Sequence, residues 1–307
     1  MLLYLDDAFA EHETGAHPEC PQRILGLNQL LRNSGWLERA VLPHWTSATP
    51  EQLMAVHDAA YITDLQHWCE QAVGRIESDT VISHGSWKAA LLAAGAAVDA
   101  TERVMRGQQQ TAFCAIRPPG HHAKPSGAMG FCLFNNVAIA AHAALSAGAH
   151  RIMIVDWDVH HGNGTQDVFY ADGRVGFFSI HRSPFYPGTG SKNETGAGAG
   201  LGYISNAPVP AETNLREFVQ TFEKGLTALA DKTKPELILL SAGFDAHQAD
   251  PVGSLCLQDE DFAELTRIVK QVAEVHCEGR IVSLLEGGYH LDHMPRSALE
   301  HVKALAE

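Results

Sequence analysis

The chain has 307 residues, of which 45% are hydrophobic and 19% charged, so its composition is that of an ordinary globular protein with a large core. Its 22 basic and 36 acidic residues give a formal net charge of −14, which argues against direct nucleic-acid binding and is compatible with cationic substrates. The six cysteines form no CxxC pair, and no basic and apolar leader follows Met1, so we expect a reduced, cytoplasmic protein. The longest apolar stretch, residues 89–100, contains Asp99 and is too short to span a membrane.

Short apolar runs alternate with helical patterns along the chain. The predicted strands cover residues 2–5, 111–116, 151–158, 175–181, 236–243 and 280–287. The predicted helices cover residues 21–34, 50–73, 83–106, 135–147, 212–231 and 258–276. This alternation predicts an α/β fold with a central, mostly parallel sheet and helices on both faces. Because no linker or low-complexity tract divides the chain, we expect a single domain over residues 1–307.

Polar and glycine-rich segments follow five of the six predicted strands. These segments are RPPGHH (117–122), VHHGNGT (159–165), RSPFYPGTG (182–190), FDAHQADP (244–251) and GYH (288–290). The carboxyl ends of parallel strands lie on one edge of a sheet, which is where such folds bind their ligands. We therefore expect these segments to form one site.

In the stretch that begins with the predicted strand 151–158, Asp156, Asp158 and His160 are spaced by two. If the backbone stays extended to the end of the strand, the three side chains share one face. Carboxylate and imidazole together suit zinc or another divalent transition metal, and the absence of paired thiolates favours a catalytic site. Asp245, at the end of a neighbouring predicted strand, is well placed to be a third ligand and leaves a position open for water.

Five motifs stand out in the chain: RPPGHHA (117–123), GFCLFNN (130–136), VDWDVHHGNGT (155–165), SAGFDAHQADP (241–251) and LEGGYHL (285–291). Together they resemble the zinc-dependent histone deacetylases of the arginase/deacetylase superfamily. The segment HPECPQRI (17–24) resembles the branch with class II enzymes and bacterial homologues. The resemblance extends over nearly the whole chain in the order of the family, and implies the arginase/deacetylase fold.

The resemblance implies a role for each matching residue. The implied zinc ligands are Asp158, His160 and Asp245, the implied proton-transfer residues are His121 and His122, and the implied hydrogen-bond donor to the substrate carbonyl is Tyr289. In the acyl-lysine tunnel, the resemblance implies a backbone acceptor at Gly130 and aromatic walls at Phe131 and Tyr186. A buried monovalent-cation site, usually for potassium, is implied at Asp156, Asp158, His160, Ser179 and Ile180. A second such site matches more loosely at Phe169, Asp172, Val175 and Tyr203. His181 and His247 lie near the same edge without a firm match to a ligand.

The two adjacent histidines are expected to have different partners. By resemblance, His121 pairs with Asp156, and His122 faces Asn163 where other branches carry aspartate. A neutral amide does not stabilise imidazolium as a carboxylate does, so we expect a lower pKa for His122 than in those relatives. We take His122 as the general base and acid and His121 as electrostatic support, with the reverse assignment left open.

Three functions stay open from the sequence. The preferred one is hydrolysis of acyl groups from the ε-amine of lysine in peptides or proteins; the second is the same reaction on acetylpolyamines or another small amide. The third, an inactive acyl-lysine reader, is disfavoured because the implied ligands, both histidines and Tyr289 are all present. The native metal stays open between zinc, iron(II) and cobalt(II), and so does the oligomeric state.

Two rim positions bear on the substrate. Polyamine-selective eukaryotic members of the family carry a glutamate after the Asp-Pro of the AGFD…DP segment, where this chain has Val252. Asp79 lies near where relatives place a polar residue that binds the backbone of a peptide substrate, and its alternative interpretation is a surface acid that caps a helix. Both positions favour acyl-lysine peptides over acetylpolyamines.

Overall fold

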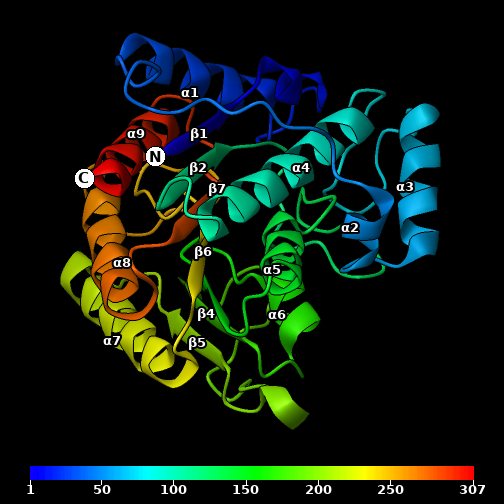
Figure 1. Ribbon diagram of the computed structural model, residues 1–307. Helices are drawn as coiled ribbons and strands as arrows, with labels where there is room; N and C mark the ends of the chain where they lie inside the picture. Colours follow the sequence, from blue (N-terminus) through cyan, green and yellow to red (C-terminus); the bar gives the residue numbers. More distant parts are fainter.

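A single sheet runs through the computed structural model, which describes residues 1–307 (Figure 1). Its seven strands lie in the order β1-β2-β7-β6-β3-β4-β5, and every neighbouring pair is parallel. The strands are β1 (Leu2–Leu5), β2 (Thr111–Ala115), β3 (Ile152–Asp156), β4 (Val175–Arg182), β5 (Ile204–Val209), β6 (Leu237–Ala242) and β7 (Ile281–Leu285).

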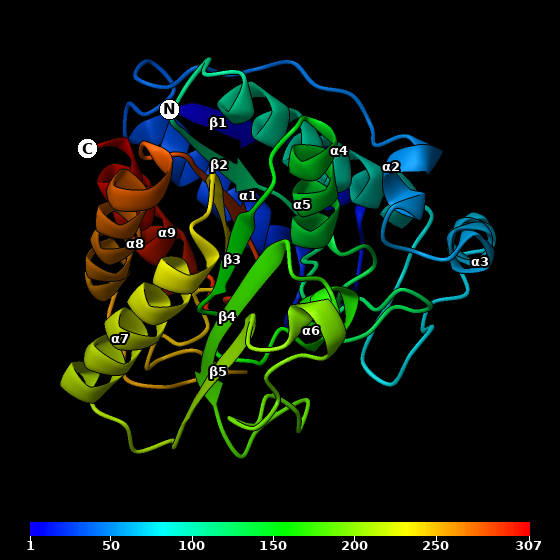
Figure 2. The same ribbon diagram turned by 60° about the horizontal axis from the view of Figure 1, so that its bottom comes forward.

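Helices cover both faces of this sheet (Figure 2). One layer contains α1 (Pro21–Asn33), α7 (Leu215–Thr233), α8 (Asp261–Cys277) and α9 (His293–Ala306). The other contains α2 (Pro50–Met54), α3 (Ala59–Glu70), α4 (Ser86–Met105), α5 (Asn136–Ser146) and α6 (Asn163–Phe169). Short 3-10 helices occupy Asp7–Glu11 and Gly198–Gly200. No helix has both the length and the apolar character needed to cross a bilayer.

The central strands are apolar on both faces because helices pack against both. All residues of β3, β6 and β7 are buried, and their sequences IMIVD, LILLSA and IVSLL hold almost no polar residues before the carboxyl ends. Continuous apolar runs of this kind are typical of the interior of a doubly covered parallel sheet. The predicted α/β fold class is therefore confirmed, and the sheet is wholly rather than mostly parallel.

Two of the predicted elements were wrong in their extent. The helix predicted over 50–73 is broken into α2 and α3, because residues between them bind the loop before α5. There, the Asp58 amide donates to the Pro125 carbonyl at 2.8 Å and His57 Nε2 accepts from the Asn135 amide at 2.9 Å. The strand predicted over 151–158 ends at Asp156, so Asp158 and His160 lie in the following loop. The sequence patterns also missed β5, α6 and α9.

Candidate active site

Three side chains converge at the carboxyl edge of the neighbouring strands β3 and β6. Asp158 and His160 follow β3, and Asp245 follows β6. His160 Nδ1 lies 3.0 Å from Asp158 Oδ1 and 3.1 Å from Asp245 Oδ2, and all three residues are buried. Phe185, which sequence reasoning did not single out, stacks on the His160 ring with centroids 5.1 Å apart. The predicted third residue of the group thus lies beside the other two.

The loop after β3, and not an extended strand, brings these groups together. Asp156 Oδ1 accepts from the Asp158 amide at 3.1 Å, and Asp158 Oδ1 accepts from the His160 amide at 2.9 Å. Such bonds from a carboxylate to the amide two residues on curl the backbone into consecutive tight turns. The expectation that Asp156, Asp158 and His160 share a strand face was therefore wrong, and Asp156 turns to His121 instead.

The donor set fits a divalent cation. Burial, together with the neighbouring Asp158 carboxylate, raises the pKa of Asp245 to about 7, because two buried carboxylates repel each other. A cation held between them relieves that repulsion, and two carboxylates with one imidazole are ligands that zinc accepts. A side chain at Gly287 would collide with both carboxylates, so this glycine keeps the space around them clear.

The tandem histidines have the partners that the sequence predicted. His121 Nδ1 lies 2.9 Å from Asp156 Oδ2, and His122 Nδ1 lies 2.6 Å from Asn163 Oδ1. Burial opposes charging of His121, but the Asp158 and Asp156 carboxylates outweigh it and hold the pKa of His121 well above its usual range. Burial, with the neighbouring His121 and His160, holds the pKa of His122 well below its usual range. The pKa values of the two adjacent rings are therefore shifted in opposite directions.

A buried carboxylate behind the histidines was not predicted. Glu286 accepts hydrogen bonds from the Gly120 amide at 2.6 Å, the His121 amide at 3.1 Å and Ser241 Oγ at 3.0 Å. Burial raises the pKa of Glu286 to about 7. The residue belongs to the quoted LEGGYHL motif, so its position was visible, but its contact with the loop before α5 was not.

Tyr289 lies on the loop after β7 and faces an aromatic wall. Its ring is edge-on to Phe131 with centroids 5.6 Å apart, and the Arg23 guanidinium lies 4.8 Å from its ring centroid. The Tyr289 amide donates to Asp250 Oδ2 at 2.6 Å, a contact that sequence reasoning missed. Burial, with Asp245 nearby, raises the pKa of Tyr289 well above its usual range, so the hydroxyl stays a hydrogen-bond donor.

A cavity of about 270 Å³ brings His122, His160 and Tyr289 together. Its nine lining residues are Asp79, His122, Gly130, Phe131, His160, Phe185, Tyr186, Val252 and Tyr289. All four predicted substrate-contact residues, Asp79, Gly130, Phe131 and Tyr186, therefore lie on one cavity. Phe131 has a φ of 69°, and any side chain at Gly130 would collide with His122, so this turn is tightly fitted.

Asp79 is not a helix cap in the structure. The nearest following helix, α4, begins at Ser86, and the Asp79 carboxylate instead accepts from Thr80 Oγ at 3.1 Å. Thr80 Oγ in turn accepts from the Phe131 amide at 3.1 Å. The alternative interpretation of Asp79 was wrong, and this rim residue is linked to the cavity wall.

The residues matched to the monovalent-cation sites also lie together in the fold. Asp156 of β3 is the register partner of Ser179 of β4, and Ile180 follows it. Ser179 Oγ lies 2.9 Å from His181 Nδ1. In the looser group, the Asp172 carboxylate pairs with the Arg174 guanidinium at 2.6 Å. Potassium at either place stays a prediction.

The family model for the histone deacetylase domain matches residues 17–305. The chain belongs to the histone deacetylase family. A probable deacetylase of Archaeoglobus fulgidus is 39% identical over 99% of this chain and 86% of its own length. A histone deacetylase-like amidohydrolase of Pseudomonas aeruginosa is 35% identical over 94% of this chain and 77% of its own length. The crystal structure of the HDA15 HD domain matches this histone deacetylase fold with a TM-score of 0.94 at 34% identity, over 99% of this chain and 87% of that one. The family resemblance is thereby confirmed, and the chain is a hydrolase of the histone deacetylase family.

Proposed function

We propose that this histone deacetylase family member is a zinc-dependent amidohydrolase that removes acetyl or related acyl groups from the ε-amine of lysine in peptides or proteins. The observation that carries the proposal is that His160, His122 and Tyr289 all line one narrow cavity of about 270 Å³. A metal ligand, a neutral imidazole and a protonated phenol at one cavity are the groups that amide hydrolysis needs.

The proposed metal centre consists of Asp158, His160 and Asp245. Zinc held there would supply an acidified water and polarise the amide carbonyl. By family resemblance, potassium would occupy the neighbouring group that includes Ser179 and Ile180. The roles of the remaining residues follow from their own contacts.

His122 is the proposed proton carrier. Asn163 Oδ1 is a hydrogen-bond acceptor 2.6 Å from His122 Nδ1, so Nδ1 carries the ring proton and Nε2 has a free lone pair. The Asn163 orientation is supported by its amide group, which donates to Met129 Sδ at 3.3 Å. Because the pKa of His122 lies well below its usual range, the ring is neutral and accepts a proton from the attacking water. It then passes this proton to the departing amine.

His121 is the proposed electrostatic support. It is paired with Asp156 at 2.9 Å, and this carboxylate favours the charged form of the imidazole. A charged imidazole has no free lone pair, which disfavours His121 as the base. Tyr289 would donate its hydroxyl hydrogen to the carbonyl oxygen as negative charge develops there.

The rim of the cavity favours acyl-lysine over acetylpolyamines. Val252 lines the cavity, and its apolar side chain provides no carboxylate to bind the distant ammonium group of an acetylpolyamine. Asp79 lies on the same cavity and is available to accept from the backbone amides of a peptide. The apolar walls at Phe131 and Tyr186 suit the methylene chain of lysine.

Side-by-side kinetics test the substrate proposal. The kcat/KM for acetyl-lysine peptides should exceed that for N-acetylputrescine and N8-acetylspermidine. A preference for the acetylpolyamines by tenfold or more, about 1.4 kcal/mol in transition-state binding, would replace acyl-lysine by a small amide as the substrate. Binding of acetyl-lysine peptide without turnover of any of these compounds would instead favour the reader function.

A further inference from the structure

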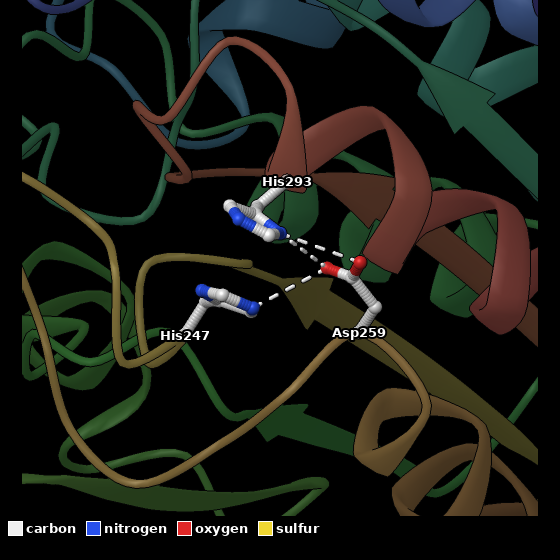
Figure 3. Close-up of side chains that lie close together, drawn as sticks. All are labelled: His247, Asp259 and His293. Atoms are coloured by element: carbon white, nitrogen blue, oxygen red, sulfur yellow. Dashed lines mark hydrogen bonds and ion pairs between the residues drawn. The ribbon is translucent and has the colours of Figure 1, made fainter.

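A second group of metal-ligating side chains lies outside the cavity: His247, Asp259 and His293 (Figure 3). His247 is on the loop after β6, Asp259 precedes α8, and His293 is the first residue of α9. One donor atom from each lies within 4.8 Å of the others. Figure 3 shows both rings turned toward the carboxylate from different segments.

A buried nitrogen in this group has no hydrogen-bond partner. His247 is 2% exposed, and its Nε2 makes no hydrogen bond although Asp259 Oδ1 lies 3.3 Å away. Leaving a buried polar atom unsatisfied is destabilising, so native structures usually pair such atoms or give them a ligand. The nitrogen is close enough to the carboxylate for a hydrogen bond, but the geometry of the pair is not that of one.

The separations of each imidazole nitrogen from the Asp259 carboxylate match those between ligands of one tetrahedral metal ion, and the donor atoms of all three residues lie within 4.8 Å of one another. His247 Nε2 lies 3.3 Å from Asp259 Oδ1, and His293 Nδ1 lies 3.2 Å and 3.3 Å from the two carboxylate oxygens. Metal–ligand bonds of about 2.0–2.1 Å place neighbouring tetrahedral ligands about 3.3 Å apart. We propose that His247, Asp259 and His293 bind a second divalent transition-metal ion, with zinc the best match to two imidazoles and one carboxylate.

The surroundings of the group suit a partly open site. Ser297 Oγ donates to Asp259 Oδ1 at 3.0 Å, which fixes the carboxylate as second-sphere donors commonly do for metal ligands. The side chains of Asp259 and His293 are 22% and 31% exposed, so an ion can enter and a water can complete the coordination.

Metal binding at this site would break one local hydrogen bond. The Ala249 amide donates to His247 Nδ1 at 3.1 Å, so the neutral ring carries its proton on Nε2. Coordination through Nε2 moves that proton to Nδ1, and the bond from Ala249 must then open. We expect the loss of this hydrogen bond to weaken zinc binding at the site.

The site would join two segments that also serve the cavity. His247 is two residues after Asp245, and His293 is four residues after Tyr289. A bound ion therefore cross-links the loop after β6 to the start of α9. The inference does not depend on deacylase activity, because its ligands are not among the residues assigned to that reaction.

Zinc counting on the purified full chain tests the site. The protein is stripped, dialysed against micromolar zinc, and its bound zinc is measured by elemental analysis. Wild type should bind one zinc per chain more than His293→Asn and one more than Asp259→Asn. His290→Asn is the matched control. The His290 and His293 ring centroids lie 4.6 Å apart, but His290 Nδ1 accepts from the Asp292 and His293 amides and is not part of the ligand group, so this variant should bind as much zinc as wild type.

Equal zinc content in wild type and both ligand variants, with circular dichroism showing them folded, would overturn the second site. The difference between wild type and variant is independent of the first centre. If the Asp158, His160 and Asp245 group fails to bind, the totals drop by one but the difference remains.

Discussion

At the proposed metal centre, each carboxylate is fixed through one oxygen by a backbone amide from a distant segment. The Gly287 amide donates to Asp158 Oδ2 at 2.9 Å, and the Val159 amide donates to Asp245 Oδ1 at 2.9 Å. The other oxygen of each lies beside His160 Nδ1, and that of Asp158 also accepts from the His160 amide. Ligand geometry is thus set before any ion binds, which is the preorganisation that a catalytic metal site requires.

Tyr289→Phe should fold normally and lose about a hundredfold or more in kcat, because it deletes a hydrogen bond made to the developing negative charge. The KM should change little, since the ring still packs on Phe131. Tyr186→Phe is the control, because it also loses only a hydroxyl from the cavity wall and should retain most activity. Steady-state kinetics on an acetyl-lysine peptide measure both variants. If Tyr289→Phe hydrolysed the peptide at the wild-type rate, Tyr289 would have no role in the mechanism.

At the scale of elements, one carboxylate joins the loops that follow β6 and β7. Asp250 Oδ2 accepts from the Tyr289 and His290 amides, and Asp250 Oδ1 accepts from the Val252 and Gly253 amides. The side chain is buried, so all four amides depend on it. This carboxylate sets the backbone position of Tyr289.

Asp250→Asn should therefore lower both stability and kcat. An asparagine amide group can accept on one side only, so two of the four backbone donors lose their partner, at about 2 kcal/mol of unfolding free energy or more. Urea unfolding and kinetics on the same preparation measure the two effects, with exposed Asp292→Asn as control. Unchanged kcat in a destabilised variant would show that Asp250 supports the fold without positioning Tyr289.

Helix α9 is attached to α8 and β7 by a neutral buried histidine. His301 Nδ1 lies 2.7 Å from Thr266 Oγ1, and His301 Nε2 lies 2.8 Å from Ser283 Oγ. Burial lowers the pKa of His301 from 6.5 to about 3. The unfolded chain therefore binds one more proton here between these two pH values, and stability falls as the pH falls through that window.

Replacing this histidine should flatten the acid dependence of stability. His301→Gln should be less stable than wild type at pH 7, but its unfolding free energy should fall less steeply between pH 6 and pH 4. The difference in slope should approach about 1.4 kcal/mol per pH unit, the value for one proton. Denaturant unfolding at several pH values gives both slopes, and parallel slopes would mean that His301 is not held neutral.

For the molecule as a whole, the sequence pattern was sufficient to predict those strands whose burial is evident from their local composition. The runs at β3, β6 and β7 predicted an α/β sheet because strands covered on both faces must be apolar throughout. The edge strand β5 was not predicted, because its sequence ISNAPV mixes polar residues and a proline with apolar ones. It pairs only with β4, at the edge of the sheet, and this tertiary contact leaves no pattern in the local sequence.

The same distinction holds for the site. Asp158, His160 and Asp245 were predictable because each closely follows a predicted strand at one edge of a parallel sheet. Both tandem histidines and Tyr289 were predicted from the resemblance of their motifs to the histone deacetylases. Glu286 and Asp250 lie in the same motifs, but their importance comes from backbone amides that are distant in sequence. Contacts of a side chain with remote backbone leave no pattern of residue types, so only the fold reveals them.

Metal dependence of turnover on an acetyl-lysine peptide tests the central claim most directly. Chelated wild-type protein should release no acetate above background, and added zinc should restore release in wild type but not in Asp245→Ala, which lacks one of the three ligands. Full activity after chelation, or wild-type turnover by Asp245→Ala, would contradict the account.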